Sequence, residues 1–254
     1  MQAETRATLS KVPAITLGFW LIKILATTLG ETAGDTLSMT MNLGYLASTA
    51  IFALLLLVLV WRQVAATAYR PYLYWATIIA STTAGTTMAD FATRSLGIGY
   101  AGGSALLLAA VLLSLASWRL TLGSISAAHV ADARTEIFYW VTITFSQTLG
   151  TALGDWTADS AGMGYGGAAI LFASGLALLL TAYWLTSISR IALFWAAFIL
   201  TRPLGAAVGD FLDKPLDHGG LAFSRPLASA VLGAAILALV VLSRWRADDY
   251  SREI

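Results

Sequence analysis

The stretch from Trp20 to Asp35, WLIKILATTLGETAGD, returns in altered form three more times along the chain. The other copies read WATIIASTTAGTTMAD, WVTITFSQTLGTALGD and WAAFILTRPLGAAVGD. In each copy an aromatic residue precedes the Trp, a Gly stands ten residues after it, and the Asp stands fifteen residues after it. A further Gly follows nine residues after each Asp. Four matches at one fixed spacing identify a tandem repeat.

The copies begin 55, 65 and 55 residues apart, so the first two form one half of the chain and the last two form another. The Trp residues are Trp20, Trp75, Trp140 and Trp195, and the Asp residues are Asp35, Asp90, Asp155 and Asp210. Copies two and four also carry a basic residue four positions after the Asp, Arg94 and Lys214. We expect repeats at about 14–68, 69–124, 134–188 and 189–245 within a single transmembrane domain covering residues 1–254.

The composition indicates a membrane protein. Of 254 residues, 58% are hydrophobic and only 11% are charged, whereas a soluble domain carries about 25% charged residues. The formal net charge of +1 provides no basic surface for nucleic acid. The absence of cysteine excludes disulfides, thiolate metal sites and iron–sulfur clusters. Only two histidines occur, His129 and His218, both in polar connecting segments, which excludes a haem held by two histidines inside the membrane.

Segments of about 20 apolar residues are long enough to cross a bilayer as a helix. The chain contains eight, and the first segment of each repeat is the more polar one; they span about 14–37, 44–61, 73–93, 98–118, 137–157, 164–185, 191–212 and 221–243. The sequence therefore predicts an all-α polytopic membrane protein in which eight transmembrane helices form four two-helix repeats. Because each repeat has two spans, all copies have the same, parallel topology.

Basic residues in the connections set the orientation in the membrane. Ten lie at the termini and in the connections on the same side: Arg6, Lys11, Arg62, Arg70, Arg119, Arg134, Arg190, Arg244, Arg246 and Arg252. Three lie on the other side: Arg94, Lys214 and Arg225. Both termini are therefore expected in the cytoplasm. Arginine exceeds lysine and alanine is abundant, which favours a bacterial protein of the cytoplasmic (inner) membrane.

Polar residues between the Trp and the Asp fall on one helix face, at steps of three or four residues. They are Lys23, Thr27 and Glu31 in copy one, Thr82 and Thr86 in copy two, Gln147 and Thr151 in copy three, and Arg202 in copy four. A charge in the middle of a membrane costs about 2.5–3.5 kcal/mol, so such residues face a bundle interior or a wet cavity. We expect the four faces to converge, with the four Asp residues at one depth in the outer half of the membrane.

The acidic surplus on these faces suggests a cation site. Five carboxylates stand against Lys23 and Arg202, which leaves a formal −3. Carboxylate, hydroxyl and amide oxygens suit Mg, Ca or Mn, and we predict the metal ligands to be Glu31, Asp35, Asp90, Asp155 and Asp210. The core polar residues with a coupling role are predicted to be Lys23, Thr27, Thr82, Gln147 and Arg202. Lys23 and Arg202 serve either as internal counter-ions or as binding groups for an anionic substrate.

Each of these features also has a structural interpretation. Trp at a helix end is often a membrane-interface anchor, so we predict that Trp20, Trp75, Trp140 and Trp195 serve as interface anchors or as a gate. Gly and Thr on one face allow close helix packing. A Gly-Asp pair at a helix end can cap the helix.

The four tandem two-helix units, each with its Trp, resemble a bacterial family of multi-pass membrane proteins described as a four-fold repeat of unknown function. This resemblance covers nearly the whole chain and implies its topology. The segment GETAGDT is also similar, at Glu31, Gly34 and Asp35, to the Glu-x-Gly-Asp signature of calcium/manganese–proton exchangers. It has one additional residue in the spacing, Thr36 replaces the base that follows in that family, and the other copies lack the Glu.

We therefore expect a transporter, not an enzyme, that exchanges a divalent cation of the Mn, Ca or Mg class for protons. Its partners are the lipid bilayer, the small ion and protons, and no resident cofactor is expected besides a bound divalent cation; the residues specify no oligomeric state. One alternative is an enzyme resembling intramembrane aspartyl proteases, whose signature has Gly three residues before the Asp, where this chain has Thr32, Ala152 and Ala207. Another is a structural or sensory membrane protein without transport.

Overall fold

Four helices carry the repeated Trp-to-Asp stretches. The computed structural model describes residues 10–250, and all regular secondary structure in that range is helical. We call the four the inner helices: α2 (Leu17–Asp35), α4 (Pro71–Asp90), α6 (Ala133–Asp155) and α8 (Arg190–Asp213). The side chains of Thr16, Asp132 and Ser189 accept backbone N–H groups from the first turns of α2, α6 and α8, as is typical of N-caps. Pro71 begins α4, where its missing N–H costs nothing.

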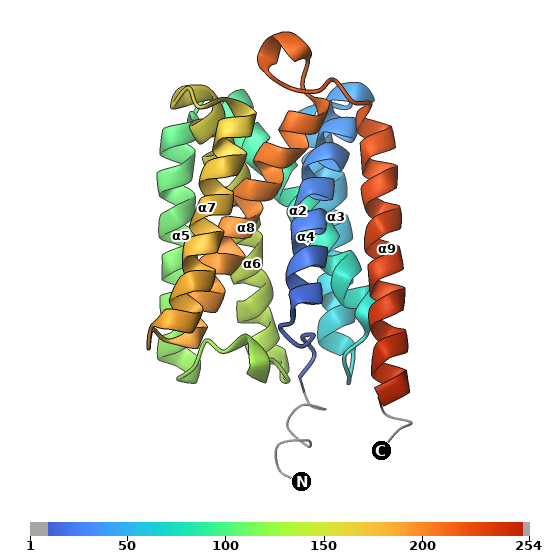
Figure 1. Cartoon of the computed structure of the whole chain (residues 1–254), viewed down its shortest axis with the longest axis vertical. Helices are drawn as coiled ribbons and strands as arrows, with labels where there is room; N and C mark the ends of the chain where they lie inside the picture. The colour runs from blue at the N-terminus through green and yellow to red at the C-terminus, as the bar shows by residue number, and fades with distance from the viewer. Residues whose placement is uncertain (1–9, 251–254) are drawn as a thin grey trace.

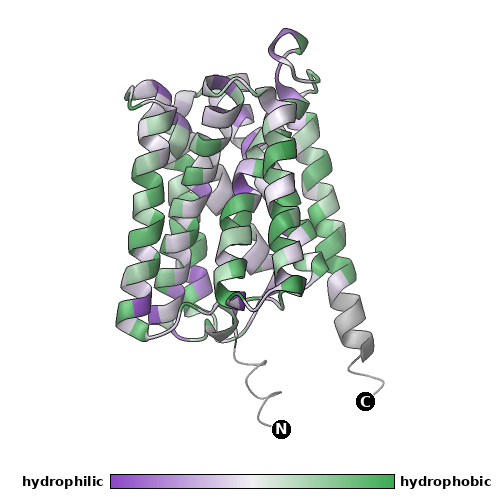
Figure 2. Cartoon of the chain, turned by 60° about the vertical axis from the view of Figure 1, so that its left-hand side comes forward, coloured by the Kyte–Doolittle hydropathy of each residue, from purple (hydrophilic) through white to green (hydrophobic). Residues whose placement is uncertain are grey.

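The outer helices are α3 (Gly44–Ala65), α5 (Tyr100–Leu122), α7 (Gly164–Leu185) and α9 (Arg225–Tyr250). Among the described residues, these four and α8 are long and apolar enough to cross a membrane. Large hydrophobic side chains such as Leu54, Leu113 and Ile170 point outward from them, and hydrophobic residues dominate the flanks of the bundle (Figure 2). The protein is therefore a polytopic α-helical membrane protein with eight helices, as predicted. Arg6 and Arg252, two residues used for the predicted orientation, lie outside the described residues.

The inner helices form a closed ring in the order α2, α4, α6, α8, with α8 packed against α2 (Figure 1). Each outer helix packs on the inner helix of the following repeat: α3 on α4, α5 on α6, α7 on α8, and finally α9 on α2. All four inner helices run in the same direction, which confirms the parallel topology. We call the end where they begin the Trp end and the opposite end the Asp end.

The repeats differ where the inner helices finish. In the first three copies the Asp is followed by a five-residue π-helical segment: η1 (Thr36–Thr40), η2 (Phe91–Ser95) and η4 (Trp156–Ser160). In the fourth copy α8 continues to Asp213, and the connection to α9 contains a short 3₁₀ turn, η5 (Leu216–His218). A second 3₁₀ turn, η3 (Ala127–His129), lies in the connection between the two halves. The fourth copy thus places one additional carboxylate, Asp213, at the Asp end.

Glycines set the close spacing of the ring. In each inner helix, the Gly that stands ten residues after the Trp packs against the next inner helix around the ring. The residue that it contacts there stands seven positions after that helix's own Trp. The contacts are Gly30 with Thr82, Gly85 with Gln147, Gly150 with Arg202, and Gly205 with Thr27. Small residues allow helix backbones in a membrane to approach closely. The repeated Gly therefore fixes the side chains that point into the ring.

Gly85→Ala is expected to lower the melting temperature of the purified protein. An added Cβ would lie 2.9 Å from the backbone of both Gln147 and Thr148, and backbone atoms cannot rotate away, so α4 and α6 would have to separate. Overpacking of this kind costs about 1–3 kcal/mol. The matched control is Gly233→Ala in α9, where an added Cβ meets no atom within 4 Å. Equal melting temperatures for the two variants in detergent would contradict this account of the ring.

Candidate functional site

The side chains that face the centre of the ring lie in four layers, because steps of four residues keep nearly the same helix face. Each layer takes one residue from each inner helix, and all sixteen side chains are at most 2% exposed. From the Trp end, the Lys23 layer is Lys23, Ile78, Ile143 and Phe198; the Arg202 layer is Thr27, Thr82, Gln147 and Arg202; the Glu31 layer is Glu31, Thr86, Thr151 and Ala206; and the Asp layer is Asp35, Asp90, Asp155 and Asp210.

Two basic residues hold the Asp layer together. The Arg94 guanidinium lies 2.9 Å from Asp90 and 3.1 Å from Asp155. The Lys214 ammonium lies 2.7 Å from Asp35 and 2.9 Å from Asp210. Each base therefore bridges the Asp of its own repeat and the Asp of the following one.

The four aspartates are thus brought together inside the bundle, as the repeat predicted. The positions of Arg94 and Lys214, four residues after an Asp on the same helix face, carried the signal for these bridges in the sequence.

Sequence reasoning missed two charged residues of this site, Asp213 and Arg225. The Nε of Arg225 lies 2.9 Å from the Asp213 carboxylate and 3.7 Å from that of Asp35. Asp213 lies beyond the repeated stretch, and Arg225 begins an outer helix. The repeat contains neither residue; only the position of Asp213, three residues after Asp210 on α8, gave a signal in the sequence, and Arg225 had none.

Three carboxylates lie close enough to share a metal ion. Within residues 10–250 this group consists of Asp35, Asp210 and Asp213, whose oxygen atoms lie within 4.8 Å of one another. Of the five predicted ligands, Asp35 and Asp210 belong to the group, whereas Glu31, Asp90 and Asp155 do not. Asp90 and Asp155 lie on the opposite side of the layer, where Arg94 joins them.

A pocket of about 390 Å³ opens at the Asp end beside this group. Its lining residues are Met39, Arg94, Asp159, Tyr165, Lys214, Pro215, His218 and Arg225. None of the three grouped carboxylates lines the pocket, but Lys214 and Arg225 both line it and contact Asp35.

Charge at the Asp end is not balanced. The Asp layer and Asp213 supply five carboxylates, while Arg94, Lys214 and Arg225 supply three cations, and Asp159 adds a further carboxylate at the pocket. Burial would lower the pKa of Lys214, just past the end of α8, but the carboxylates of Asp210, Asp35 and Asp213 hold that pKa well above its usual value. Lys214 is therefore a cation in the absence of metal.

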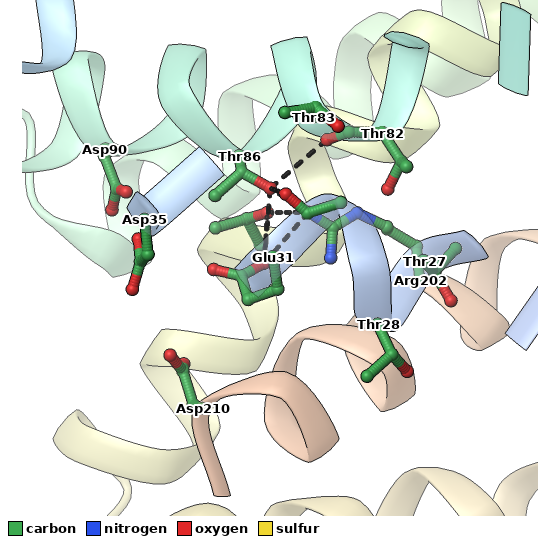
Figure 3. A network of polar contacts seen from close by, with 12 residues as sticks. Thr27, Thr28, Glu31, Asp35, Thr82, Thr83, Thr86, Asp90, Arg202 and Asp210 are labelled. Carbon is green, nitrogen blue, oxygen red and sulfur yellow. Dashed lines mark hydrogen bonds and ion pairs between the residues drawn. The ribbon is translucent and has the colours of Figure 1, made fainter. Parts of the chain in front are cut away.

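The Glu31 carboxylate pairs with Arg202 (Figure 3), whereas Asp35, with which the sequence suggested that it acts, pairs with Lys214. Nη2 of Arg202 donates to Glu31 at 3.0 Å and to Thr86 Oγ1 at 2.6 Å, and it also donates to Thr151. Figure 3 shows these side chains meeting beside Asp35, Asp90 and Asp210. All four inner helices surround this contact, since Ala206 fills the fourth position of the layer.

The predicted core polar residues have different environments. Thr27 uses its hydroxyl to donate to the carbonyls of Ile24 and Thr201, which joins α2 to α8. Thr82 and Gln147, although fully buried, have side-chain polar atoms without a hydrogen-bond partner. Lys23 lies in an otherwise apolar layer, with its ammonium 3.5 Å from the centre of the Phe198 ring.

Aromatic side chains fill the Trp end of the ring. Trp75, Trp140 and Trp195 are only 3–4% exposed, so the prediction that they anchor the protein at the lipid interface is wrong for these three; Trp20 is half-buried. They pack with the aromatic residue before each Trp, namely Phe19, Tyr74, Tyr139 and Phe194. The Tyr74 and Tyr139 hydroxyls are 2.6 Å apart. This aromatic layer packs across the Trp end of the ring, and its role as a gate stays a prediction.

The fold and these layers define a multi-pass membrane protein built from four two-helix repeats around a buried charged core. The chain belongs to the family described as Repeat of Unknown Function (DUF347), whose model matches residues 18–69, 73–123, 138–189 and 193–248. These four matches coincide with the four repeats read from the sequence. Comparison with curated proteins and with solved structures gave no match.

Proposed function

We propose that the protein transports a divalent metal cation of the Mn, Ca or Mg class across a bacterial cytoplasmic membrane in exchange for protons. The observation that carries this proposal is the group of Asp35, Asp210 and Asp213, whose carboxylate oxygens lie within 4.8 Å of one another beside the pocket at the Asp end. Oxygen-only ligand sets favour hard divalent cations.

The charge of the site supports a divalent ion. The carboxylates at the Asp end outnumber its basic side chains, which favours a cation with more than one charge. Lys214 lies between Asp35 and Asp210 and contacts both. We infer that it acts as a tethered counter-ion, which leaves the carboxylates when the metal binds and returns when the metal leaves.

Protons are the natural exchange partner. A carboxylate inside a membrane is costly without a cation, and a metal must displace protons from its ligands in order to bind. Each transport cycle then couples metal release to proton uptake at the same three carboxylates. Metal affinity is accordingly expected to fall as the pH is lowered.

Access to the site is expected to alternate between the two ends. The positive-inside rule places the Trp end in the cytoplasm, so the pocket faces the outside. The aromatic layer around Trp75, Trp140 and Trp195 then blocks the cytoplasmic route in this state. Transport would require these rings to separate.

The alternatives are less well supported by the geometry. An aspartyl protease needs two carboxylates that share a proton, whereas the aspartates here are joined through Arg94 and Lys214. A purely structural or sensory protein needs no carboxylate group beside an open pocket, although the ion pairs alone are compatible with such a role.

Flux measurements in proteoliposomes test the proposal. Vesicles with a pH-sensitive dye inside are exposed to Mn²⁺, Ca²⁺ or Mg²⁺ over a range of external pH. We expect saturable uptake of at least one metal, accompanied by a rise of the internal pH as protons leave. Metal flux equal to that of protein-free vesicles for all three ions would refute transport of this class. Metal uptake with no pH change would refute the exchange.

Asp213→Asn is expected to weaken metal affinity by about 100-fold or more. Loss of a residue that only supports a metal ligand already costs about 10–100-fold, and here one of three ligands would be removed. Asp217→Asn, in the exposed η5 turn of the same connection, is the matched control and should bind metal like the unmodified protein. Equal affinities for the two variants by calorimetric titration would remove Asp213 from the site.

A further inference from the structure

The half of the ring nearer the Trp end contains two buried basic side chains whose N–H groups are not satisfied. Lys23 and Arg202 are both fully buried. The Lys23 ammonium has no hydrogen-bond partner, and neither do Nε and Nη1 of Arg202. Only Nη2 of Arg202 donates hydrogen bonds to the Glu31 layer. The Nε and Nη1 groups of its guanidinium therefore remain available as donors to another acceptor.

The neighbouring side chains of these groups are donor-rich. Gln147 and Thr82 share the Arg202 layer, and the Gln147 amide and the Thr82 hydroxyl are buried without partners. Lys23 lies one layer closer to the Trp end, where its layer companions are Ile78, Ile143 and Phe198. The charged neighbour that acts on Lys23 is Arg202, another cation.

The negative charge in this region does not balance the two cations. Glu31 is the carboxylate paired with Arg202, and it lies on the Asp side of the guanidinium. The ring of Phe198 gives the Lys23 ammonium a cation–π contact at 3.5 Å, which favours the charged lysine but supplies no hydrogen-bond acceptor. Lys23 Nζ and the Nε and Nη1 atoms of Arg202 therefore have no carboxylate as a partner in the membrane interior, where an unpaired charge is costly.

We propose that one small monovalent anion of the chloride class binds in the core between Lys23 and Arg202, with N–H and O–H donors from Gln147 and Thr82. The anion supplies both missing elements, a negative charge and an acceptor for several donors. A water molecule would supply only the acceptor. The inner helices pack closely where Gly85 meets Gln147 and Gly150 meets Arg202, which favours a small anion over a larger one such as phosphate.

This site is separate from the proposed metal site. The Glu31 layer lies between them, and the two have opposite charge preferences. The anion would neutralise Lys23 permanently while the Asp end binds and releases cations. Its test therefore needs neither metal nor transport.

The experiment compares the melting temperature of the purified full-length protein in chloride, bromide and gluconate at constant ionic strength, with EDTA present. We expect a rise of several degrees in chloride and bromide that saturates with concentration, and no rise in gluconate, which is too large for the site. Equilibrium dialysis with radioactive chloride should give one bound ion per chain. A melting temperature that is the same in all three anions would overturn the proposal.

Lys23→Met provides the variant test, because Met fits the apolar layer of Ile78, Ile143 and Phe198. This variant should lose the chloride dependence and bound chloride, and should melt at a higher temperature than the unmodified protein in gluconate. Lys11→Met is the matched control: Lys11 is also a buried lysine, but Glu136 pairs with it at 2.7 Å. It should melt earlier in every buffer and keep the chloride dependence. Chloride dependence that survives in Lys23→Met would also overturn the proposal.

Discussion

Asp35→Asn is expected to abolish metal transport and leave the protein folded. Asp35 belongs to the three-carboxylate group, contacts Lys214 at 2.7 Å, and lies 3.7 Å from Arg225. Its second oxygen, Oδ1, is buried without a hydrogen-bond partner, so it can serve as a metal ligand. Asparagine keeps the size of the side chain but removes the charge that a divalent cation requires.

Folding should survive because the two bases keep other partners. Lys214 still has Asp210 at 2.9 Å, and Arg225 still has Asp213 at 2.9 Å. Flux in proteoliposomes, normalised to folded protein, measures the effect. Transport by Asp35→Asn at the rate of the unmodified protein would show that this carboxylate is not a ligand.

Asp90→Asn is the matched control for Asp35→Asn. It removes an equally buried carboxylate from the same layer, one that lies outside the three-carboxylate group. Arg94 keeps Asp155 at 3.1 Å. The variant should therefore transport with a smaller loss, and a loss as complete as that of Asp35→Asn would indicate a site that needs the whole Asp layer.

Arg202→Met is expected to be among the most destabilising single substitutions in the chain. It leaves Glu31 charged and unpaired at the centre of the ring, and breaking a buried ion pair by removing one partner costs about 3–5 kcal/mol. The Thr86 and Thr151 hydroxyls still donate to Glu31, but they lose the Arg202 N–H group that donates to them. Unfolding in detergent, followed by tryptophan fluorescence, measures the loss.

The double variant Glu31→Gln/Arg202→Met distinguishes the loss of the Glu31–Arg202 ion pair from the cost of leaving Glu31 without its partner. With both charges gone no unpaired charge remains, so the double variant should be clearly more stable than Arg202→Met alone. Arg62→Met, at an exposed position of α3, is the control and should change the free energy of unfolding by less than about 0.5 kcal/mol. A double variant as unstable as Arg202→Met would show that Glu31 and Arg202 are not coupled.

Much of the fold followed from the repeat. The Trp-to-Asp spacing in the four copies predicted four equivalent helices with one polar face each, and the structure buries all twelve polar residues predicted on those faces. Alternation of polar and apolar segments predicted which helices lie inside and which face lipid, because a polar face is stable in a membrane only when other helices cover it.

The sequence did not predict which charged side chains of the core form ion pairs with one another. Glu31 and Asp35, one turn apart on α2, were expected to act together, yet Glu31 pairs with Arg202 of α8, 171 positions away in the chain. The rotation and height of α8 relative to α2 decide this contact. Those quantities depend on how Gly205 and Gly209 of α8 pack against α2, and no periodicity within one helix encodes them.

The sequence by itself determined the number of helices, their parallel repeat and the burial of the four aspartates, since these depend on hydropathy and on helix periodicity along a single segment. Only the tertiary structure decided that Asp213 joins Asp35 and Asp210, that Arg225 from an outer helix approaches them, and that Lys23 has no carboxylate partner. These properties arise from the closure of the ring, in which α8 and α9 both pack against α2. Ion pairs act over a few ångströms, so they depend on which distant segments that closure brings into contact.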